Sequence, residues 1–468
     1  MGDAIHILRY GTVADQKDIL ASKQCFDYLA INANMVAHRG STLARYMCQE
    51  LRKPYFIDPI TYAFQRKIHL LHAKPNKEEV GNDSERPFKE SILKLVENYQ
   101  TFDMVIKQNR SIEAQCMEKV STQRELCEEV MEFQLHGLTT ALEKDEMMDY
   151  LQYESDMKAQ SILKSLEPVW IVAPYFYLDV DDETWLTINI SLCEIMCQLK
   201  IEKKIEQPIM AQLLLSKEVL TSKEALRKIV ERYSQLPCDG YLIWVDDFEE
   251  IQSRQEELYG LLQLLKGLAE KPKYNMYGGF FSILLTSKEI GLLEGVSHGL
   301  EYGEARKAFP FGGGIPSSKY YFLPLHKRLL FQESFRLLER IQVINSLEPN
   351  WGEPARYFRE ICRCPKCKEL LKEGMIGFNR YQSREFYEVH YKTHTSNRIK
   401  AGKETKESCR AHYLACKQME FYMVKKKKLD ELLLSMDKER QKYELLDEKN
   451  VPVQYLQRWE NVLESARR

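Results

Sequence analysis

Short runs of apolar residues alternate along the chain with longer stretches in which apolar positions recur at helical spacing. This alternation is typical of βα units, in which each strand is followed by a helix that packs against the sheet. Eight apolar runs have the character of a strand, at residues 26–31, 54–57, 169–174, 208–212, 240–245, 279–285, 299–302 and 320–323. Eight such runs separated by helices predict an α/β fold, a (β/α)8 TIM barrel, with a doubly wound parallel sheet as the alternative.

The same pattern divides the chain into segments. Residues 1–75 hold the first βα units of the predicted barrel, and residues 76–165 form a long, mostly helical stretch rich in Glu, Lys and Met. We interpret that stretch as a helical insertion after the second strand. The remaining strands fall within 166–345, and we expect a zinc-binding subdomain at 346–424 and a helical tail at 425–468.

The composition of the chain mainly excludes classes of protein. The 468 residues are 44% hydrophobic and 11% aromatic, and 67 basic side chains nearly balance 69 acidic ones. This much apolar material fills a core, which excludes intrinsic disorder. The chain has no uninterrupted apolar run of about 18 residues, and its first residues lack the pattern of a signal peptide, so we expect a cytoplasmic protein without a membrane partner. The even charge balance confines any nucleic-acid contact to a local patch, such as the lysines at 425–428.

Polar side chains gather where the predicted strands end. In a barrel of this kind the catalytic groups stand at the carboxyl ends of the strands. The polar residues near these ends are rich in carboxylates and comprise Asp58, Asp179, Gln212, Asp246, Asp247, Ser287, Glu301 and Glu304. Four aromatic residues close by either stack on a nucleobase turned out of its helix or, as the plainer alternative, fill the core: Tyr62, Tyr175, Tyr177 and Trp244.

Three of the twelve cysteines stand together and predict a metal site. They form the pattern Cys362-x-Cys364-x-x-Cys367, and His390 follows after 22 further residues. Three thiolates and one imidazole make the closed tetrahedral set that structural zinc prefers. His394 lies one helical turn beyond His390 and is an alternative fourth ligand, with His412 as a weaker candidate. The plain alternative is a reduced Cys-x-x-Cys pair beside an unrelated histidine.

A barrel followed by this cysteine and histidine pattern resembles the tRNA-guanine transglycosylase superfamily. Residues 57–65 resemble the family's segment of an aspartate and a Phe-Gln pair after the second strand, although the Ser-Gly-Gly core of that segment is missing. Residues 208–212 resemble the strand that delivers a base-reading glutamine, and residues 238–241 resemble the start of the next strand. The spacing to His390 is similar to that of the archaeal members. The resemblance covers residues 20–75 and 166–424, and its specific motif is the cysteine pattern.

The resemblance implies a reaction in which a carboxylate displaces guanine from C1′ of a nucleotide and a 7-deazaguanine base then displaces the carboxylate. By position, Asp58 would be the acid and base. Glu304 best matches the nucleophile and Glu301 is its alternate, although the family has aspartates there; Asp246 or Asp247 is a further alternative. The residues implied to bind substrate are Tyr62, Gln65, Asp179 and Gln212.

The departures from the family bear on the substrate polymer. The missing Ser-Gly-Gly core, together with the lack of room for an RNA-binding domain after residue 424, resembles the branch that inserts 7-deazaguanine derivatives into DNA, so we expect DNA rather than tRNA. A homo-oligomer or accessory modification proteins are compatible with this hypothesis. Two other hypotheses stay open: an inactive barrel that binds nucleic acid or a partner protein, and a metal-dependent hydrolase that uses Asp246 and Asp247.

Overall fold

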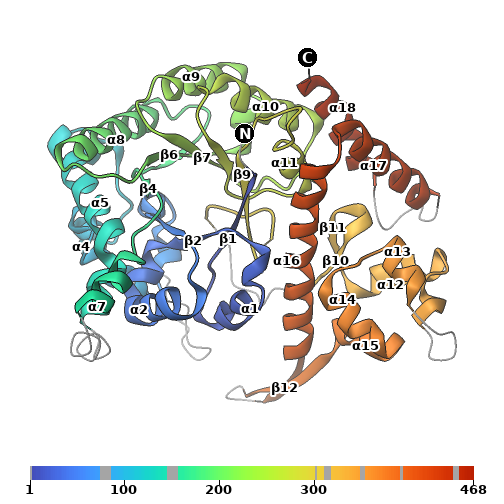
Figure 1. Ribbon diagram of the computed structural model, residues 1–468. Coiled ribbons are helices and arrows are strands. Elements are labelled where there is room, and N and C mark those ends of the chain that lie inside the picture. The colour runs from blue at the N-terminus through green and yellow to red at the C-terminus, as the bar shows by residue number, and fades with distance from the viewer. Residues whose placement is uncertain are drawn as a thin grey trace.

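In the computed structural model, eight parallel strands form a nearly closed barrel (Figure 1). The structure describes residues 3–73, 86–144, 156–300, 303–309, 318–347, 354–390, 394–445 and 453–467. The strands follow the order β3-β2-β1-β9-β8-β7-β6-β4, and the short β5 pairs with β6. A backbone hydrogen bond of 2.8 Å from Val169, just before β4, to the carbonyl of Tyr55 in β3 joins the two ends of the sheet. The bounds of the sheet strands are β1 (Ile5–Arg9), β2 (Tyr28–Asn32), β3 (Tyr55–Asp58), β4 (Ile171–Val172), β5 (Tyr177–Leu178), β6 (Ile209–Leu215), β7 (Gly240–Val245), β8 (Lys273–Asn275) and β9 (Gly295–Gly299).

Helices surround the barrel in the order expected of βα units (Figure 1). They are α1 (Gln16–Ala21), α2 (Ala33–Arg45), α5 (Val120–Glu143), α8 (Glu183–Glu202), α9 (Lys223–Ser234), α10 (Gln255–Gly267), α11 (Phe280–Leu284) and α16 (Lys403–Lys426). The last of these, α16, packs against both α11 and α1. It therefore fills the remaining place in the ring, although about a hundred residues separate it from β9.

Part of the predicted helical insertion lies within this ring. The chain between β3 and β4 contains α3 (Glu90–Val96), α4 (Asp103–Gln108), α5 and α7 (Asp156–Lys164). Of these, α5 packs between α2 and α8 and also contacts β4. The barrel requires one helix between these two strands, and α5 is that helix.

The chain between β9 and α16 forms a group of small elements on the outer side of α16 (Figure 1). Two antiparallel hairpins frame it, β10 (Tyr320–Phe322) with β11 (Lys327–Leu329) and β12 (Arg384–His390) with β13 (Thr395–Ala401). Between them lie α12 (Phe331–Arg340), α13 (Ala355–Glu360), α14 (Pro365–Leu370) and α15 (Gly374–Asn379). After α16, α17 (Leu429–Glu444) and α18 (Gln454–Ala466) pack on each other, and α18 also packs on α10.

Three of the predicted barrel strands are wrong. The apolar run 279–285 is mostly helix α11, because Gly279 caps a helix there. The run 320–323 begins with β10, which pairs only with β11 and stands outside the barrel. Strand β9 ends at Gly299, where the predicted seventh strand begins; residues 301 and 302 of that run lie outside the described residues. The barrel instead uses β1 and β8, in which polar residues such as His6 and Lys273 interrupt the apolar pattern.

Aromatic side chains fill the amino end of the barrel. The ring of Trp170 lies 5.2 Å from that of Tyr28, 5.1 Å from Phe56 and 4.6 Å from Tyr274, measured between centroids. These residues come from four different strands or strand ends, so they close the lower end of the barrel as a packed layer. A ligand site in this barrel is therefore expected at its carboxyl end. In the described part of the chain, no helix has the length and apolar character needed to cross a membrane.

Candidate functional site

Asp58 stands at the carboxyl end of β3, inside the barrel mouth, and is 0% exposed. Its Oδ2 accepts a hydrogen bond from Nη2 of Arg9 at 2.7 Å, and its Oδ1 accepts from the hydroxyl of Tyr175 at 2.7 Å and from the backbone N–H of Ile60 at 3.1 Å. Arg9 ends β1, and the same Nη2 also donates to Asn32 at the end of β2. Three adjacent strands thus deliver one buried ion pair, as a barrel does with the residues at its strand ends.

Aromatic rings enclose this ion pair. Tyr62 stacks on Tyr175 with ring centroids 5.6 Å apart and meets the Trp244 ring edge-on at 5.3 Å. The guanidinium of Arg9 lies 4.9 Å from the centroid of Tyr277. Burial, and then the charge of Asp58, raise the pKa of Tyr175 well above its ordinary value. Tyr175 therefore remains a hydrogen-bond donor to Asp58 at every physiological pH.

Residues 303–309, which we call the mouth segment, cross the carboxyl end of the barrel. The carbonyl of Arg306 accepts hydrogen bonds from Nε1 of Trp244 at 3.3 Å and from the backbone N–H of Asp247 at 3.1 Å. The carboxylate of Asp246 accepts from the N–H of Ala308 at 2.6 Å. The side chain of Arg306 donates to the hydroxyl of Tyr277 at 3.0 Å. The mouth segment is thus tied to β7 and to the chain that follows β8.

Glu304 belongs to a second cluster, on the side of the barrel that faces α16. It forms an ion pair with Lys417 of α16 and accepts a hydrogen bond of 3.4 Å from Tyr413. Lys417 is 0% exposed and also pairs with Glu420 at 2.8 Å, which in turn bonds to His326 at 2.6 Å. Although burial alone lowers it, the charges of Glu304 and Glu420 raise the pKa of Lys417. Glu304 is therefore held beside a permanent positive charge.

Replacing Lys417 by methionine is expected to destabilise the protein by about 3–5 kcal/mol, since the buried carboxylate of Glu420 and the partly exposed carboxylate of Glu304 would lose their cation. Lys417 and His326 lower the pKa of Glu420 against the effect of burial, so their contribution to stability is present at neutral pH and lost as the pH falls. The deficit of the variant should therefore shrink in acid. Urea unfolding at neutral and acid pH measures it, and Lys426→Met, on the exposed end of the same helix, is the matched control. An equal, small effect of both substitutions would contradict the expectation.

A second carboxylate faces Glu304 across Gly279. A Cβ atom on Gly279 would lie 2.7 Å from Oε2 of Glu250 and 3.1 Å from Oε2 of Glu304. Glu250 is buried, and its Oε1 accepts hydrogen bonds from both the N–H and the hydroxyl of Ser282. Burial, reinforced by the charge of Glu304, raises the pKa of Glu250 to about 7. Below about pH 7, Glu250 is thus mostly protonated beside the carboxylate of Glu304.

Glu250 should make the stability of the protein pH-dependent. Its folded pKa of about 7 lies above the ordinary value of 4.5, so the folded state binds more protons between these values and the free energy of unfolding falls as the pH rises. A shift of this size corresponds to about 3 kcal/mol. Urea unfolding from pH 4.5 to 7.5 should show this slope in the natural protein, and Glu250→Gln should flatten it. The exposed Glu256→Gln is the control; an unchanged slope in Glu250→Gln would rule out this assignment.

The residues implied to bind substrate are dispersed over the mouth. Tyr62 is the one that lies in the aromatic shell around Asp58. The side-chain amide of Gln65 is used structurally, because it donates to the carbonyl of Tyr177 and accepts from its N–H. Asp179 accepts from Ser216 at 2.9 Å; this hydrogen bond, one from Val180 and the charge of Arg66 together lower its pKa, although burial raises it. Asp179 is therefore ionised and already partnered.

Gln212 lies deeper in the barrel. It pairs in register with Leu242, two residues before Trp244 on the same face of β7, so its side chain points to the interior one layer below the mouth. It is 2% exposed, and within the described residues neither its amide oxygen nor its amide nitrogen has a hydrogen-bond partner. An unsatisfied buried amide is costly, which makes Gln212 a candidate to bind a ligand's polar edge.

The proposed catalytic carboxylates, Asp58 and Glu304, are held by different partners. Asp58 bonds to Arg9, Tyr175 and Ile60, whereas Glu304 bonds to Lys417 and Tyr413, and over the described ranges the two sets do not overlap. Asp246 is bonded to the mouth segment, and Asp247 pairs with the exposed Lys307 at 3.2 Å. The alternate nucleophile Glu301 lies outside the described residues.

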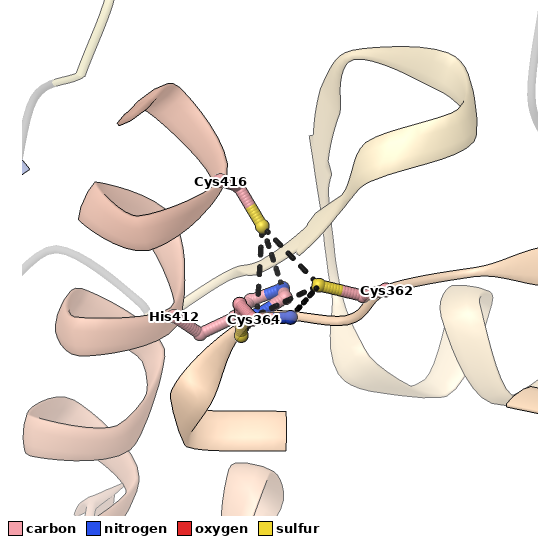
Figure 2. Close-up of side chains that lie close together, drawn as sticks. All are labelled: Cys362, Cys364, His412 and Cys416. Carbon is pink, nitrogen blue, oxygen red and sulfur yellow. Dashed lines mark hydrogen bonds between the residues drawn. The ribbon is translucent and has the colours of Figure 1, made fainter. Parts of the chain in front are cut away.

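The cysteine pattern meets α16 in a buried cluster that can hold a metal ion (Figure 2). The ligand atoms of Cys362, Cys364, His412 and Cys416 all lie within 4.8 Å of one another. Nδ1 of His412 is 3.9 Å from Sγ of Cys362, 3.2 Å from that of Cys364 and 3.6 Å from that of Cys416. The edges of a tetrahedral site with bonds of about 2.1 to 2.3 Å are about 3.5 to 3.8 Å long, so the donor set fits a tetrahedral ion.

Local hydrogen bonds prepare these side chains as ligands. Nε2 of His412 donates to the carbonyl of Tyr321 in β10 at 2.7 Å, which leaves Nδ1 with its lone pair directed at the thiols. Cys364 caps α14, with its sulfur accepting from the N–H of Cys367 at 3.3 Å, and the sulfur of Cys362 accepts from the N–H of Cys364 at 3.4 Å. N–H donors directed at sulfur stabilise thiolates, the form that binds metal.

Two members of the cluster differ from the predicted ligand set. The sulfur of Cys367 lies 3.4 Å from Nδ1 of His412 and also contacts the hydroxyls of Tyr357 and Tyr381, but it falls outside the mutually close group. His390 ends β12, and its side chain is outside the part of the structure that can be described. The histidine that meets the cysteines is His412, the weakest of the three candidates. Cys416 escaped notice, although its place four residues after His412 in a helical stretch puts both on one face.

Comparison with models of known protein families and with curated proteins found no match to this chain.

Proposed function

We propose that this protein exchanges guanine in nucleic acid, with DNA favoured over tRNA, for a 7-deazaguanine base through a covalent glycosyl-enzyme intermediate. The observation that carries the proposal is the environment of Asp58: one fully buried carboxylate at the mouth of a parallel barrel, paired with Arg9 and surrounded by aromatic rings. Such a mouth fits a planar heterocycle, whose faces stack on the rings while its polar edge meets the carboxylate.

In the proposed reaction a carboxylate attacks C1′ of the target nucleotide and the bond to N9 of guanine breaks. Asp58 takes a proton from solvent water before the first turnover and gives this proton to the departing guanine. The incoming base then attacks C1′ of the glycosyl ester, the ester bond breaks, and Asp58 takes the proton that the incoming base loses. Glu304 is the proposed nucleophile because it best matches the family's nucleophile by position, and it forms an ion pair with Lys417. Glu301 and Asp246 are the alternates.

The proposed cofactor is a structural zinc ion bound by Cys362, Cys364, His412 and Cys416. Thiolate and imidazole ligands suit zinc, and a set of four protein ligands leaves no position for substrate. Its chemistry there is to hold the elements between β9 and α16 against α16. The helix α16 supplies both the metal ligands His412 and Cys416 and Lys417, which pairs with the proposed nucleophile Glu304.

The test is the release of labelled guanine. Duplex DNA, single-stranded DNA and tRNA, each labelled in guanine, are incubated with the protein and a 7-deazaguanine base. We expect release that depends on the added base, greater from DNA than from tRNA, and a protein–nucleic acid adduct that survives denaturation when the base is withheld. Absence of release from every substrate, with no adduct, would refute the proposal.

A second candidate is an inactive barrel that binds nucleic acid or a partner protein. The observation that favours it is that Asp58 and Glu304 belong to different ion pairs, Asp58 with Arg9 and Glu304 with Lys417. It predicts binding of DNA in a gel-shift assay without guanine release or adduct, so the same incubations distinguish the two candidates.

A further inference from the structure

The mouth segment occupies the place where the proposed function needs a ligand. None of its residues, 303–309, is in a helix or strand. Phe309 packs its ring 5.9 Å from that of Tyr62 and 5.5 Å from that of Tyr177, and the guanidinium of Arg306 bonds to Tyr277. Two of these aromatic side chains also border the Asp58–Arg9 ion pair: Tyr62 stacks on Tyr175, and Tyr277 faces the guanidinium of Arg9.

We propose that the mouth segment is an autoinhibitory strap, which fills the base subsite and must withdraw before a nucleobase can reach Asp58. This inference rests on the proposed function for the identity of the ligand. Its structural basis is that Asp58 is 0% exposed in this arrangement and that Phe309 of the strap packs on Tyr62, one of the rings around Asp58.

The contacts of the strap are of the kind a nucleobase makes. Arg306 presents a planar array of N–H donors, and its charge acts on Tyr277, Tyr62 and Asp58. The N1–H and 2-amino group of guanine form a similar planar array of donors. The indole N–H of Trp244 and the carboxylate of Asp246 bond to a carbonyl and an N–H of the strap, and a carbonyl and an N–H of a purine satisfy the same groups. A base can thus replace the strap without leaving these buried groups unpaired.

The strap also has an anchor outside the mouth. Its Glu304 pairs with Lys417 of α16, and Gly303, with a positive φ of 67°, turns the chain back so that its carbonyl accepts from the N–H of Gly299 at 2.9 Å. A side chain at Gly303 would be strained there. Arg306, Ala308 and Phe309 can therefore withdraw while Glu304 keeps its ion pair with Lys417 of α16. If Glu304 is the nucleophile, the strap both contains the nucleophile and blocks the site.

The experiment measures the accessibility of Asp58. The full-length protein is treated with a water-soluble carbodiimide and a labelled amine, and the modification of Asp58 is followed by peptide mass spectrometry. We expect the double variant Arg306→Ala/Phe309→Ala to be labelled at Asp58 at least about tenfold faster than the natural protein. Lys307→Ala, an exposed neighbour in the same segment, should leave the rate unchanged. Equal rates in the double variant and the natural protein would overturn the strap.

Binding of 7-deazaguanine, measured by calorimetry, separates this inference from the proposed function. A competing strap lowers the apparent affinity by the fraction of molecules in which the mouth is open, so the double variant should bind about tenfold more tightly. Weaker binding by the variant would show that Arg306 or Phe309 belongs to the binding site and would overturn the strap. Faster labelling of Asp58 without any binding or base exchange would support an occluding strap and refute the proposed function. Urea unfolding verifies that each variant is folded, and Asp246→Asn, which weakens the bond to Ala308, gives a second way to loosen the strap.

Discussion

Replacing Cys416 by serine is expected to remove the bound metal and to destabilise the part of the protein beyond β9. Structural zinc sites contribute about 10–16 kcal/mol of apparent binding free energy in small domains, so the loss of even half of this term is comparable with the stability of a whole domain, about 5–15 kcal/mol. Cys416 belongs to the mutually close group with Cys362, Cys364 and His412, and its sulfur lies 3.6 Å from that of Cys362. Metal content per chain by mass spectrometry and the midpoint of urea unfolding measure the effect.

Two further variants make this test decisive. Cys409 lies on the same helix, is also buried and contacts the carbonyl of Tyr381, so Cys409→Ser controls for the loss of a buried thiol. His390→Ala removes the ligand that the sequence resemblance implies. If the cluster described here is the metal site, Cys416→Ser and His412→Ala lose the metal while Cys409→Ser and His390→Ala retain it. If Cys416→Ser retains the metal and His390→Ala loses it, the ligands are the predicted Cys362, Cys364, Cys367 and His390.

The metal cluster also shows what a linear pattern can and cannot predict. The three cysteines could be recognised from the sequence because residues spaced so closely must lie near one another in a tight turn of the backbone. The remaining ligands come from α16, whose distance in the sequence says nothing about its place in the fold. The chain leaves the barrel after β9 and returns to it with α16. His412 and Cys416 reach the cysteines of the motif because α16 packs between α11 and α1 as the last helix around the barrel. Their spacing of four residues was the available local signal.

The barrel could be predicted in class but only partly in its strands. Apolar runs such as 240–245 were assigned correctly because burial on both faces makes a parallel strand apolar throughout. Strand β1 was not predicted because two of its five residues are polar and form buried polar contacts. Arg9 pairs with Asp58, and Nε2 of His6 lies 2.5 Å from Nε2 of His298 in β9. Helix α11 was predicted as a strand, since a run of five residues, four of them apolar, is too short for a periodicity that distinguishes the two. The residues that defeated the pattern are in part those of the candidate site.

Asp58→Asn is expected to lower base exchange by at least about 100-fold, because asparagine keeps the shape of the side chain but cannot move a proton, and general acid–base catalysis is typically worth 10²–10⁴-fold. The measurement is the rate of guanine release from labelled DNA. Asp182→Asn is the control, since Asp182 also pairs with an arginine near the mouth, Arg66 at 2.7 Å, but is partly exposed and lies outside the shell of Asp58. A variant that releases guanine at the natural rate would remove Asp58 from the reaction.

The buried position of Asp58 requires that lost activity be separated from lost stability. Removing its charge leaves the buried guanidinium of Arg9 without its anion, which costs about 3–5 kcal/mol when one partner of a buried pair is deleted. Replacing both partners, in Arg9→Met/Asp58→Asn, removes the unpaired charge and should recover much of this loss in urea unfolding. If Asp58 is the acid and base, the double variant regains stability and remains inactive. If the pair serves only to hold β1 against β3, stability and base exchange recover together, because then the ion pair has no role that a well-packed neutral pair cannot fill.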